Sequence, residues 1–452
     1  MRRSSWYAVL AVGTLAFCLV QGQDANGVRK RISQAVGSIR LIDTHEHLWP
    51  ESERNAKQMD VFQLLHYVSS DMWADGLDRG LSEKSFSDRS LPLGEKWQIF
   101  NRHWPNVRNT AYSRALLRAV KDLYGIDDIS EGSYRSLCEK IQAANRPGWY
   151  AEVLRKRAGV DLAICDIGQA GAKLDPSLLR AVIRLDEFTL LVDTIPMVEK
   201  RDKVTIASLA DWEAALDQAV VRAKEAGFVA IKSGIAYNRT LGFKDVSQAD
   251  AEACFKNLVA RRGTISRDQW RRESVPLQDY MFGRIAGNCA KHGLPLQIHT
   301  GLFYDTWRDV AQSNPSLLTP LIIRNPQTRF ILMHGGYPYG TELLAMAKNL
   351  PNVVLDMCWV YVISSSFAYR FVNEAIETVP ADKLLGFGGD YQIVEGTYGH
   401  AMLCRETISK VLADKVLEGY WTEAEAIRYA QMILRENAIQ VFGLAPAKPL
   451  TD

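Results

Sequence analysis

The sequence predicts an α/β protein of the (β/α)8, TIM-like barrel class, with a large and mostly helical insertion after the first strand. Eight short runs rich in apolar and β-branched residues recur along the chain, and stretches with helical spacing separate them. Most runs are nearly continuous in apolar residues, as expected for parallel strands covered on both faces. Polar residues gather at the carboxyl ends of these runs, which form the catalytic face of such a barrel.

The eight expected strands are spread over the whole chain. They are Arg40–His45, Val160–Asp166, Thr189–Thr194, Phe228–Ser233, Pro295–Thr300, Arg329–His334, Asn352–Met357 and Leu384–Asp390. Two intervening helices have clear ends, because Asp211–Ala226 and Leu277–His292 show helical spacing and a glycine follows each. Strands that alternate with helices in this way predict a parallel barrel.

The first connection is too long for a simple loop. More than a hundred residues separate His47 from Val160, and they include helical stretches such as Thr110–Leu123. We expect residues 50–155, approximately, to form a helical insertion over the mouth of the barrel and to shape a pocket there. No Pro/Gly/Ser-rich linker brackets the segment, so residues 23–452 are expected to form a single barrel domain.

The overall composition is that of an ordinary globular protein. The 452 residues are 47% hydrophobic and 23% charged, and the formal net charge is +2. The basic residues form no long run, so nothing indicates a nucleic-acid partner and a small-molecule substrate is expected.

The first 22 residues have the pattern of a secretory signal peptide. Arg2 and Arg3 precede the apolar stretch Trp6–Val20, and small and polar residues follow it. This stretch is shorter than the roughly 20 residues that span a bilayer, so no stable membrane span is expected after signal removal. Phe17 stands before Cys18 where a lipoprotein signal needs a small residue, which argues against lipidation. We therefore expect export to the periplasm or the extracellular space.

Four of the eight histidines lie at carboxyl ends of expected strands. His45 and His47 form a His-x-His pair, and this spacing places both imidazoles on one face because side chains in a strand alternate. His299 ends the fifth strand, His334 the sixth and Asp390 the eighth. Taken alone, each has an ordinary explanation as a core, cap or turn residue. Together, in strand order, they favour a site for zinc or a similar divalent metal.

Five segments resemble motifs of the amidohydrolase superfamily, of the amidohydrolase-2 type. They are Ile42–Leu48, Leu296–Gly301, Met333–Pro338, Gly386–Asp390 and Glu436–Leu444. The resemblance is strongest to the branch that contains aminocarboxymuconate-semialdehyde decarboxylase, uronate isomerase and the amidohydrolase-like domain fused to fungal glutamine synthetase. These motifs are specific for the superfamily but not for a substrate.

The resemblance implies one divalent metal held by His45, His47, His299 and Asp390, with zinc expected and manganese or iron as alternatives. It also implies that His334 lies beside the metal-activated water as an acid/base or orienting residue, and that Asp390 accepts the proton of that water. The expected reaction is hydrolysis of an amide or related C–N bond in a small, carboxylated substrate.

Lys232, in the expected fourth strand, has three interpretations. In other amidohydrolases a strand-four lysine is carboxylated and bridges two metals, and His299 and His334 would then bind a second ion. An unmodified Lys232 would serve catalysis by stabilising an oxyanion, or would bind a substrate carboxylate. The third interpretation is a lysine that extends to solvent. We adopt the unmodified lysine and one metal, with Tyr237 and Arg239 as weaker candidates for contacts to an acidic substrate.

Two other classes of function stay open. A non-hydrolytic relative would use the same metal, as a decarboxylase or as a sugar-acid isomerase similar to uronate isomerase, which the long insertion resembles. A catalytically inactive binding barrel is less well supported because the ligand set is intact. The resemblance also leaves a homo-oligomer open.

Overall fold

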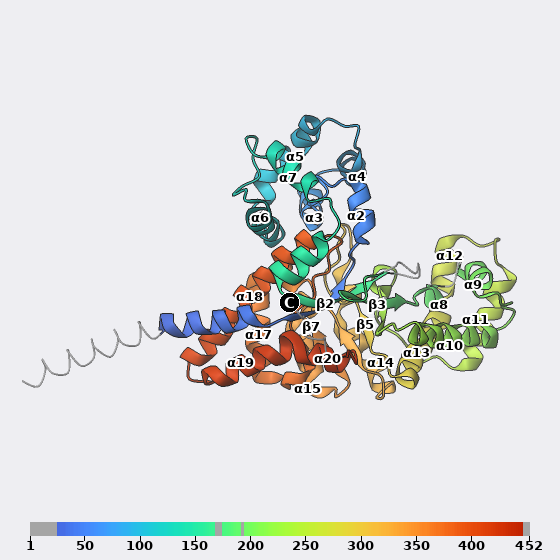
Figure 1. Ribbon diagram of the computed structural model, residues 1–452. Coiled ribbons are helices and arrows are strands. Elements are labelled where there is room, and N and C mark those ends of the chain that lie inside the picture. Colours follow the sequence, from blue (N-terminus) through green and yellow to red (C-terminus); the bar gives the residue numbers. More distant parts are fainter. Residues whose placement is uncertain (1–24, 168–173, 191–193, 446–452) are drawn as a thin grey trace, which may run out of the picture.

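The computed structural model describes residues 25–167, 174–190 and 194–445 (Figure 1). Eight parallel strands form one sheet in the order β1 to β8, and each pairs with the next. They are β1 Leu41–Glu46, β2 Val160–Asp166, β3 Leu179–Arg184, β4 Ala230–Ser233, β5 Leu296–Ile298, β6 Phe330–Leu332, β7 Val353–Asp356 and β8 Leu384–Leu385. The predicted signal peptide, with Cys18, lies outside the described residues.

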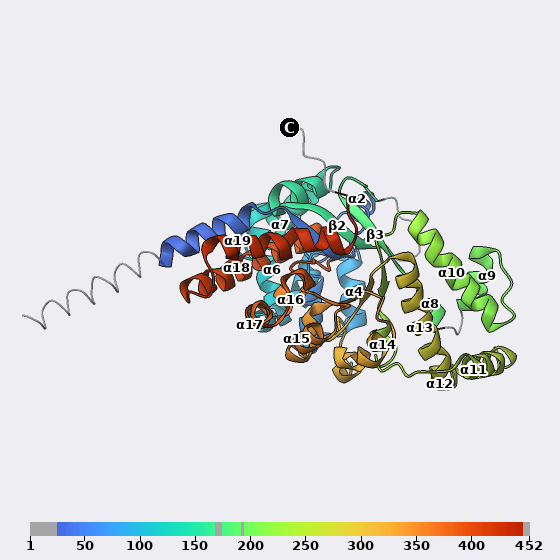
Figure 2. The same ribbon diagram turned by 90° about the horizontal axis from the view of Figure 1, so that it is seen from below.

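The sheet closes into a barrel because the residues that follow β8 run alongside β1. The amide of Thr44 donates to the carbonyl of Phe387 at 3.0 Å, and the amide of Asp390 donates to the carbonyl of His45 at 2.8 Å. Helices surround the strands (Figures 1 and 2). The predicted (β/α)8 barrel is confirmed.

The long connection between β1 and β2 is helical, as predicted. Its helices are α2 Glu51–Lys57, α3 Tyr67–Ala74, α4 Arg79–Ser87, α5 Leu93–Val107, α6 Ala111–Tyr124, α7 Tyr134–Ala143 and the π-helix η1 Ala151–Ala158. Helices α2 to α7 form a separate lobe above the barrel in Figure 1. The long helix α18 Val394–Leu417, which follows β8, packs against α6 and η1 and so joins this insertion to the barrel.

The remaining helices lie in the other connections and after the last strand. Between β3 and β5 these are α8 Glu187–Leu190, α9 Thr194–Asp202, α10 Leu209–Glu225, η2 Ile235–Tyr237, α11 Gln248–Ala260, α12 Arg267–Glu273 and α13 Val275–His292. Between β5 and β8 they are η3 Val310–Ser313, η4 Pro315–Leu318, α14 Thr319–Arg324, η5 His334–Gly336, α15 Gly340–Asn349, α16 Val360–Ile363, α17 Ser365–Thr378 and η6 Ala381–Lys383. After α18 come α19 Glu423–Gln431, η7 Met432–Glu436 and α20 Asn437–Val441.

The third strand is not where the sequence predicted it. The segment expected as strand Thr189–Thr194 is instead part of α8 and the start of α9, and β3 lies earlier, at Leu179–Arg184. Phe188, in α8, packs against Trp212 of α10 with ring centroids 4.6 Å apart, so the apolar residues here serve helix packing. Strand β3 contains Arg180 and Arg184, so its sequence lacks the continuous apolar run expected of a buried parallel strand.

Apolar side chains fill the amino-terminal end of the barrel. Ile42, Leu162 and Ile331 belong to one buried cluster with Val441 and Phe442, at and just beyond the end of α20. This packing leaves the carboxyl ends of the strands as the face on which a cavity can form. Within the described part of the chain, no helix combines the length and the apolar character that crossing a bilayer requires.

Candidate active site

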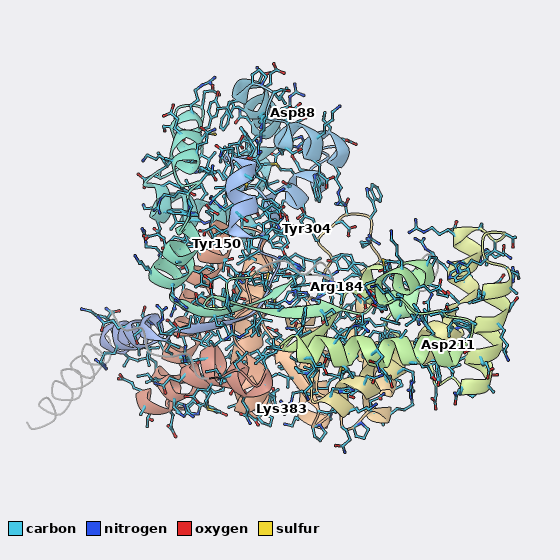
Figure 3. The ribbon with its side chains drawn as sticks, turned by 45° about the vertical axis from the view of Figure 1, so that its right-hand side comes forward. Asp88, Tyr150, Arg184, Asp211, Tyr304 and Lys383 are labelled. Atoms are coloured by element: carbon cyan, nitrogen blue, oxygen red, sulfur yellow. The ribbon has the colours of Figure 1, made fainter. Side chains whose placement is uncertain are left out.

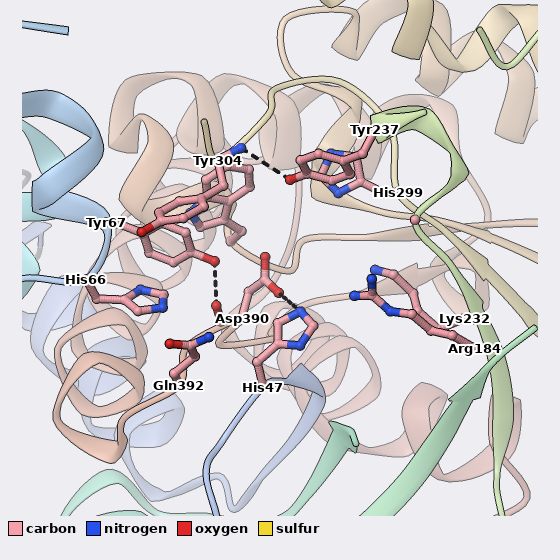
Figure 4. A pocket seen from close by; sticks show the side chains of 12 residues that line it. His47, His66, Tyr67, Arg184, Lys232, Tyr237, His299, Tyr304, Asp390 and Gln392 are labelled. Carbon is pink, nitrogen blue, oxygen red and sulfur yellow. Dashed lines mark hydrogen bonds and ion pairs between the residues drawn. The ribbon is translucent and has the colours of Figure 1, made fainter. Parts of the chain in front are cut away.

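A cavity of about 360 Å³ lies at the carboxyl ends of the strands, where barrel enzymes carry their active sites. Its volume is in the usual range for small-molecule pockets. The lining residues come from strand ends, loops and the insertion (Figure 4): His47, His66, Tyr67, Arg184, Lys232, Gly234, Tyr237, His299, Tyr304, Trp359, Asp390 and Gln392.

The His-x-His pair of β1 faces Asp390. His47 Nε2 lies 3.3 Å from Asp390 Oδ1, and His45 Nε2 lies 3.7 Å from the same oxygen. His45 is fully buried, whereas the His47 side chain is 29% exposed and reaches the cavity. One carboxylate oxygen therefore faces two imidazole nitrogens across the seam where the barrel closes.

Buried carboxyl groups of β1 hold the loop that carries Asp390. The amide of Gly389 donates to Asp43 at 3.0 Å, and the amide of Tyr391 donates to Glu46 at 2.6 Å. Asp390 lies between these two anchored amides with φ 64°, in the left-handed region that non-glycine residues seldom adopt. Such strain is typical of functional sites, where the surroundings hold a side chain in place.

The surroundings keep Asp390 ionised. Burial by itself would raise the pKa of this carboxyl, but the hydrogen bond with His47 and the neighbouring imidazoles hold the pKa well below its ordinary value. Asp390 is thus anionic at neutral pH.

His299 and His334 each direct a ring nitrogen toward the other ring. His299 Nε2 lies 2.9 Å from the carbonyl oxygen of Leu302, and His334 Nδ1 lies 3.1 Å from that of Cys358. Because a carbonyl oxygen only accepts, each of these nitrogens carries a hydrogen. In neutral rings, the lone pairs of His299 Nδ1 and His334 Nε2 then face each other at 2.9 Å.

Burial lowers the pKa of both rings, to about 4 for His334, so both are neutral near pH 7. Two lone pairs at hydrogen-bond distance need a cation or a shared proton near them. The tautomers fixed by the carbonyls therefore leave His299 Nδ1 and His334 Nε2 as the nitrogens available to a metal.

The donor set fits a divalent cation. Two groups of donor atoms, each within 4.8 Å of one another, occur among the described residues: His45, His47 and Asp166, and His334, Cys358 and Asp390. Burial raises the pKa of the Cys358 thiol well above its ordinary value, so nitrogen and carboxylate ligands are favoured over this sulfur. Of the four ligands predicted from the sequence, His45, His47 and Asp390 lie together, and His299 lines the same cavity beside His334.

The family model described as amidohydrolase (Amidohydro_2) matches residues 201–444, more than half of the chain. The chain belongs to the amidohydrolase family. The resemblance inferred from the sequence motifs is thereby confirmed, and both the family and the clustered donors support a divalent metal.

Individual relatives match the chain over different lengths. It is 29% identical to protein fluG of Emericella nidulans over 227 residues, which are 49% of this chain but only 26% of fluG. It is 20% identical to the uronate isomerase of Nostoc punctiforme over 464 residues, covering 91% of this chain and 94% of the isomerase. The structure of glucuronate isomerase from Caulobacter crescentus aligns with a TM-score of 0.74 at 18% identity, covering 94% and 95% of the two chains, and shows a shared fold.

Lys232 of this amidohydrolase is buried, so the interpretation as a lysine that extends to solvent is wrong. Its Nζ lies 3.4 Å from His45 Nε2 and donates to Met333 Sδ at 2.7 Å. Burial lowers the pKa of the amine. Lys232 thus lies in the cavity beside the His-x-His pair of β1.

The two weaker substrate candidates have different positions. Tyr237 lines the cavity, and its hydroxyl accepts a hydrogen bond from the amide of Tyr304 at 3.2 Å. Arg239 is not part of the lining, because its guanidinium forms a 2.6 Å ion pair with Asp279 and stacks on Phe243. These contacts give Arg239 a packing role, and the substrate contact predicted for it stays a prediction.

Arg184 is a cavity residue that the sequence reasoning missed. It ends β3, and its Nε donates to Asp166 Oδ2, at the end of β2, at 2.6 Å. Asp166 Oδ2 also lies 3.9 Å from His47 Nδ1, so Asp166 connects the Arg184 guanidinium with His47. With the third strand placed at Leu179–Arg184, the sequence pattern would indicate Arg184 as a site residue, because it is a basic residue at a strand end, as Lys232 is in β4.

Proposed function

We propose that this amidohydrolase is a metal-dependent hydrolase that cleaves an amide or related C–N bond in a small, carboxylated substrate. The observation that carries the proposal is the position of ionised Asp390 in the cavity. Its carboxylate contacts both imidazoles of the His-x-His pair at the end of β1. In Figure 4 it faces the basic side chains of Arg184 and Lys232.

The metal would be held by His45, His47, His299 and Asp390, and zinc is part of the proposal. When bound, a divalent cation polarises a carbonyl and lowers the pKa of a coordinated water to about 7.

Asp390 acts as the proton carrier, because it is ionised and its carboxylate lies in the cavity beside His47. It accepts a proton from the attacking water as the water oxygen bonds to the amide carbon. The C–N bond then breaks, and Asp390 delivers the proton to the leaving nitrogen, which gives a carboxylic acid and an amine. His334, next to His299, orients the reacting groups.

Arg184 and Lys232 bind the carboxylate of the substrate. Both line the cavity on the side away from the insertion, and the Arg184 guanidinium is held by Asp166. Charge-assisted hydrogen bonds of this kind orient a carboxylate and add to its affinity. We also propose that the protein is exported, as residues 1–22 predict, and that its partner is a small molecule.

The test is the variant Asp390→Asn, with Asp127→Asn as the matched control on the surface of the insertion, where the Asp127 side chain is 85% exposed. Loss of a general base lowers kcat by about 10²- to 10⁴-fold. Asp390→Asn should fall by at least this factor on an N-acyl amino acid, whereas Asp127→Asn should keep the wild-type rate. Equal rates for the two variants would disprove the role of Asp390.

A second candidate is isomerisation of a sugar acid. It is favoured by the match to uronate isomerase, which extends over nearly the whole of both chains. Incubation with glucuronate, followed by NMR, distinguishes the two reactions. Conversion of the aldehyde to a ketone, with no hydrolysis of any amide, would replace the first proposal with the second.

A further inference from the structure

A second, smaller pocket adjoins the cavity on the side of the insertion. It has a volume of about 150 Å³ and shares His66, Tyr304 and Gln392 with the main cavity. Figure 3 shows Tyr304 at the junction between the insertion and the barrel. We call this space the side pocket; its other lining residues are Trp49, Phe62, Gln63, Ser69, Trp73, Ser82, Glu83, Phe86 and Ser87.

The floor of the side pocket is aromatic and rigid. Phe62 and Phe86 stack with centroids 5.5 Å apart and an interplanar angle of 13°, and both are at most 5% exposed. Trp73 packs edge-on against Tyr304 at 5.4 Å. A cavity of about 150 Å³ with an apolar lining is large enough for a benzene ring.

Two of the polar side chains at this pocket, Gln63 and Ser82, have partners within the protein. Gln63 accepts from the amide of Asp60 at 2.7 Å and donates to the carbonyl of Phe86. Ser82 accepts from Trp73 Nε1 at 2.9 Å and donates to the carbonyl of Arg79. The aromatic side chains therefore supply the main contact surface for an occupant of this pocket.

The wall between the two spaces shows backbone strain. His66 has φ 41°, within the left-handed region, and its ring stacks on Tyr304 with centroids 5.8 Å apart. The buried Nδ1 of His66 has no hydrogen-bond partner in the described part of the chain. A non-glycine residue held in this conformation at a cavity wall is typical of a binding site.

The three parts of the combined cavity follow one another. In Figure 4, Arg184 and Lys232 lie on one side of His47 and Asp390, and His66, Tyr67 and Tyr304 lie on the other. The side pocket extends the aromatic side, away from the basic residues. A substrate with its reacting bond at Asp390 thus has a basic surface at one end and an aromatic one at the other.

We propose that the side pocket binds an aromatic group of the substrate, so that the enzyme prefers amides with a carboxylate at one end and an aryl group at the other. This inference rests on the proposed hydrolase function. N-Phenylacetylglycine is the probe: its glycine carboxylate pairs with Arg184 and Lys232, and its phenyl ring enters the side pocket. Water adds across the amide to give phenylacetate and glycine.

The experiment compares N-phenylacetylglycine with N-acetylglycine, which lacks the ring. Burial of the ring should raise affinity and kcat/KM by about 10- to 100-fold. Binding is measured by calorimetry with the full chain after treatment with a chelator, which prevents turnover, and kcat/KM is measured with the metal-loaded chain. The two readouts separate recognition of the ring from catalysis.

The matched variants are Ser69→Phe and Ser69→Ala. Ser69 is a half-buried residue of α3 that lines the side pocket but not the main cavity. Ser69→Phe fills the pocket and should reduce the preference, measured as the ratio of kcat/KM for the two amides, to about 1, and Ser69→Ala should keep the preference.

Equal binding of the two wild-type ligands, or no binding of either, overturns the side-pocket proposal. Hydrolysis of both amides without preference overturns it and leaves the hydrolase function intact. Tighter binding of the aromatic ligand without hydrolysis of either amide has the opposite meaning, because it supports the side pocket and contradicts the hydrolase function.

Discussion

Replacing Glu395 by leucine should weaken the attachment of the insertion to the barrel. The Glu395 carboxylate, at the start of α18, forms an ion pair with Arg54 of α2 and accepts from the Tyr124 hydroxyl at 2.7 Å and from Trp149 Nε1 at 2.9 Å. The Arg54 side chain is 0% exposed and that of Glu395 is 1% exposed. Three separate segments of the insertion thus meet at one buried carboxylate.

The expected loss of stability follows from these contacts. Breaking a buried ion pair by removing one partner costs about 3–5 kcal/mol, because the other charge stays buried. Each of the two donors left without an acceptor adds up to about 1–3 kcal/mol, less whatever is recovered by repacking. We expect Glu395→Leu to lower the free energy of unfolding by about 3–8 kcal/mol. The double variant Arg54→Met/Glu395→Leu should be more stable than Glu395→Leu alone, since no unpaired charge remains.

Urea denaturation followed by circular dichroism and tryptophan fluorescence measures this loss. The matched control is Glu53→Gln on α2, the helix of Arg54, where the Glu53–Lys57 pair is 50% and 40% exposed. An exposed pair contributes at most about 1 kcal/mol, so this variant should resemble the wild type. A Glu395→Leu protein within about 1 kcal/mol of wild type would refute the reasoning.

Three further predictions concern the site. Arg184→Met should raise KM about 10- to 100-fold with little change in kcat, whereas Arg239→Met, outside the cavity, should leave KM unchanged; the reverse result would restore Arg239 as a substrate residue. His400 is a buried residue of α18, and burial lowers its pKa from 6.5 to about 4. Between these pH values the unfolded chain therefore binds more protons than the folded chain, and stability falls on acidification. In urea titrations His400→Gln should therefore lose about 3 kcal/mol less than wild type between pH 7 and pH 4, and equal losses would contradict this. Lys232→Met should retain the single metal equivalent measured by mass spectrometry; a wild type with two equivalents that are lost together would show a bridging lysine.

The motif residues could be predicted because they interrupt apolar runs. His299, His334 and Asp390 each follow a continuous strand, and parallel strands bring their carboxyl ends to one face. The barrel itself follows from the same alternation of strands and helices.

The rest of the site depends on contacts between distant segments. His66 and Tyr304 come from the insertion and a loop, where no local pattern shows which side chain faces a cavity. Arg184 was hidden because its strand carries arginines, and the apolar segment after it is a helix. The partner of Arg239 is Asp279, on another element, so only the fold reveals its packing role.

Metal dependence of hydrolysis tests the proposed function most directly. The full chain is stripped with a chelator, zinc is added in steps, and the initial rate of hydrolysis of an N-acyl amino acid is recorded. We predict negligible activity in the stripped protein and a rate that saturates at one zinc per chain. A rate that is independent of zinc, or the absence of hydrolysis when zinc is bound, would contradict a one-metal hydrolase.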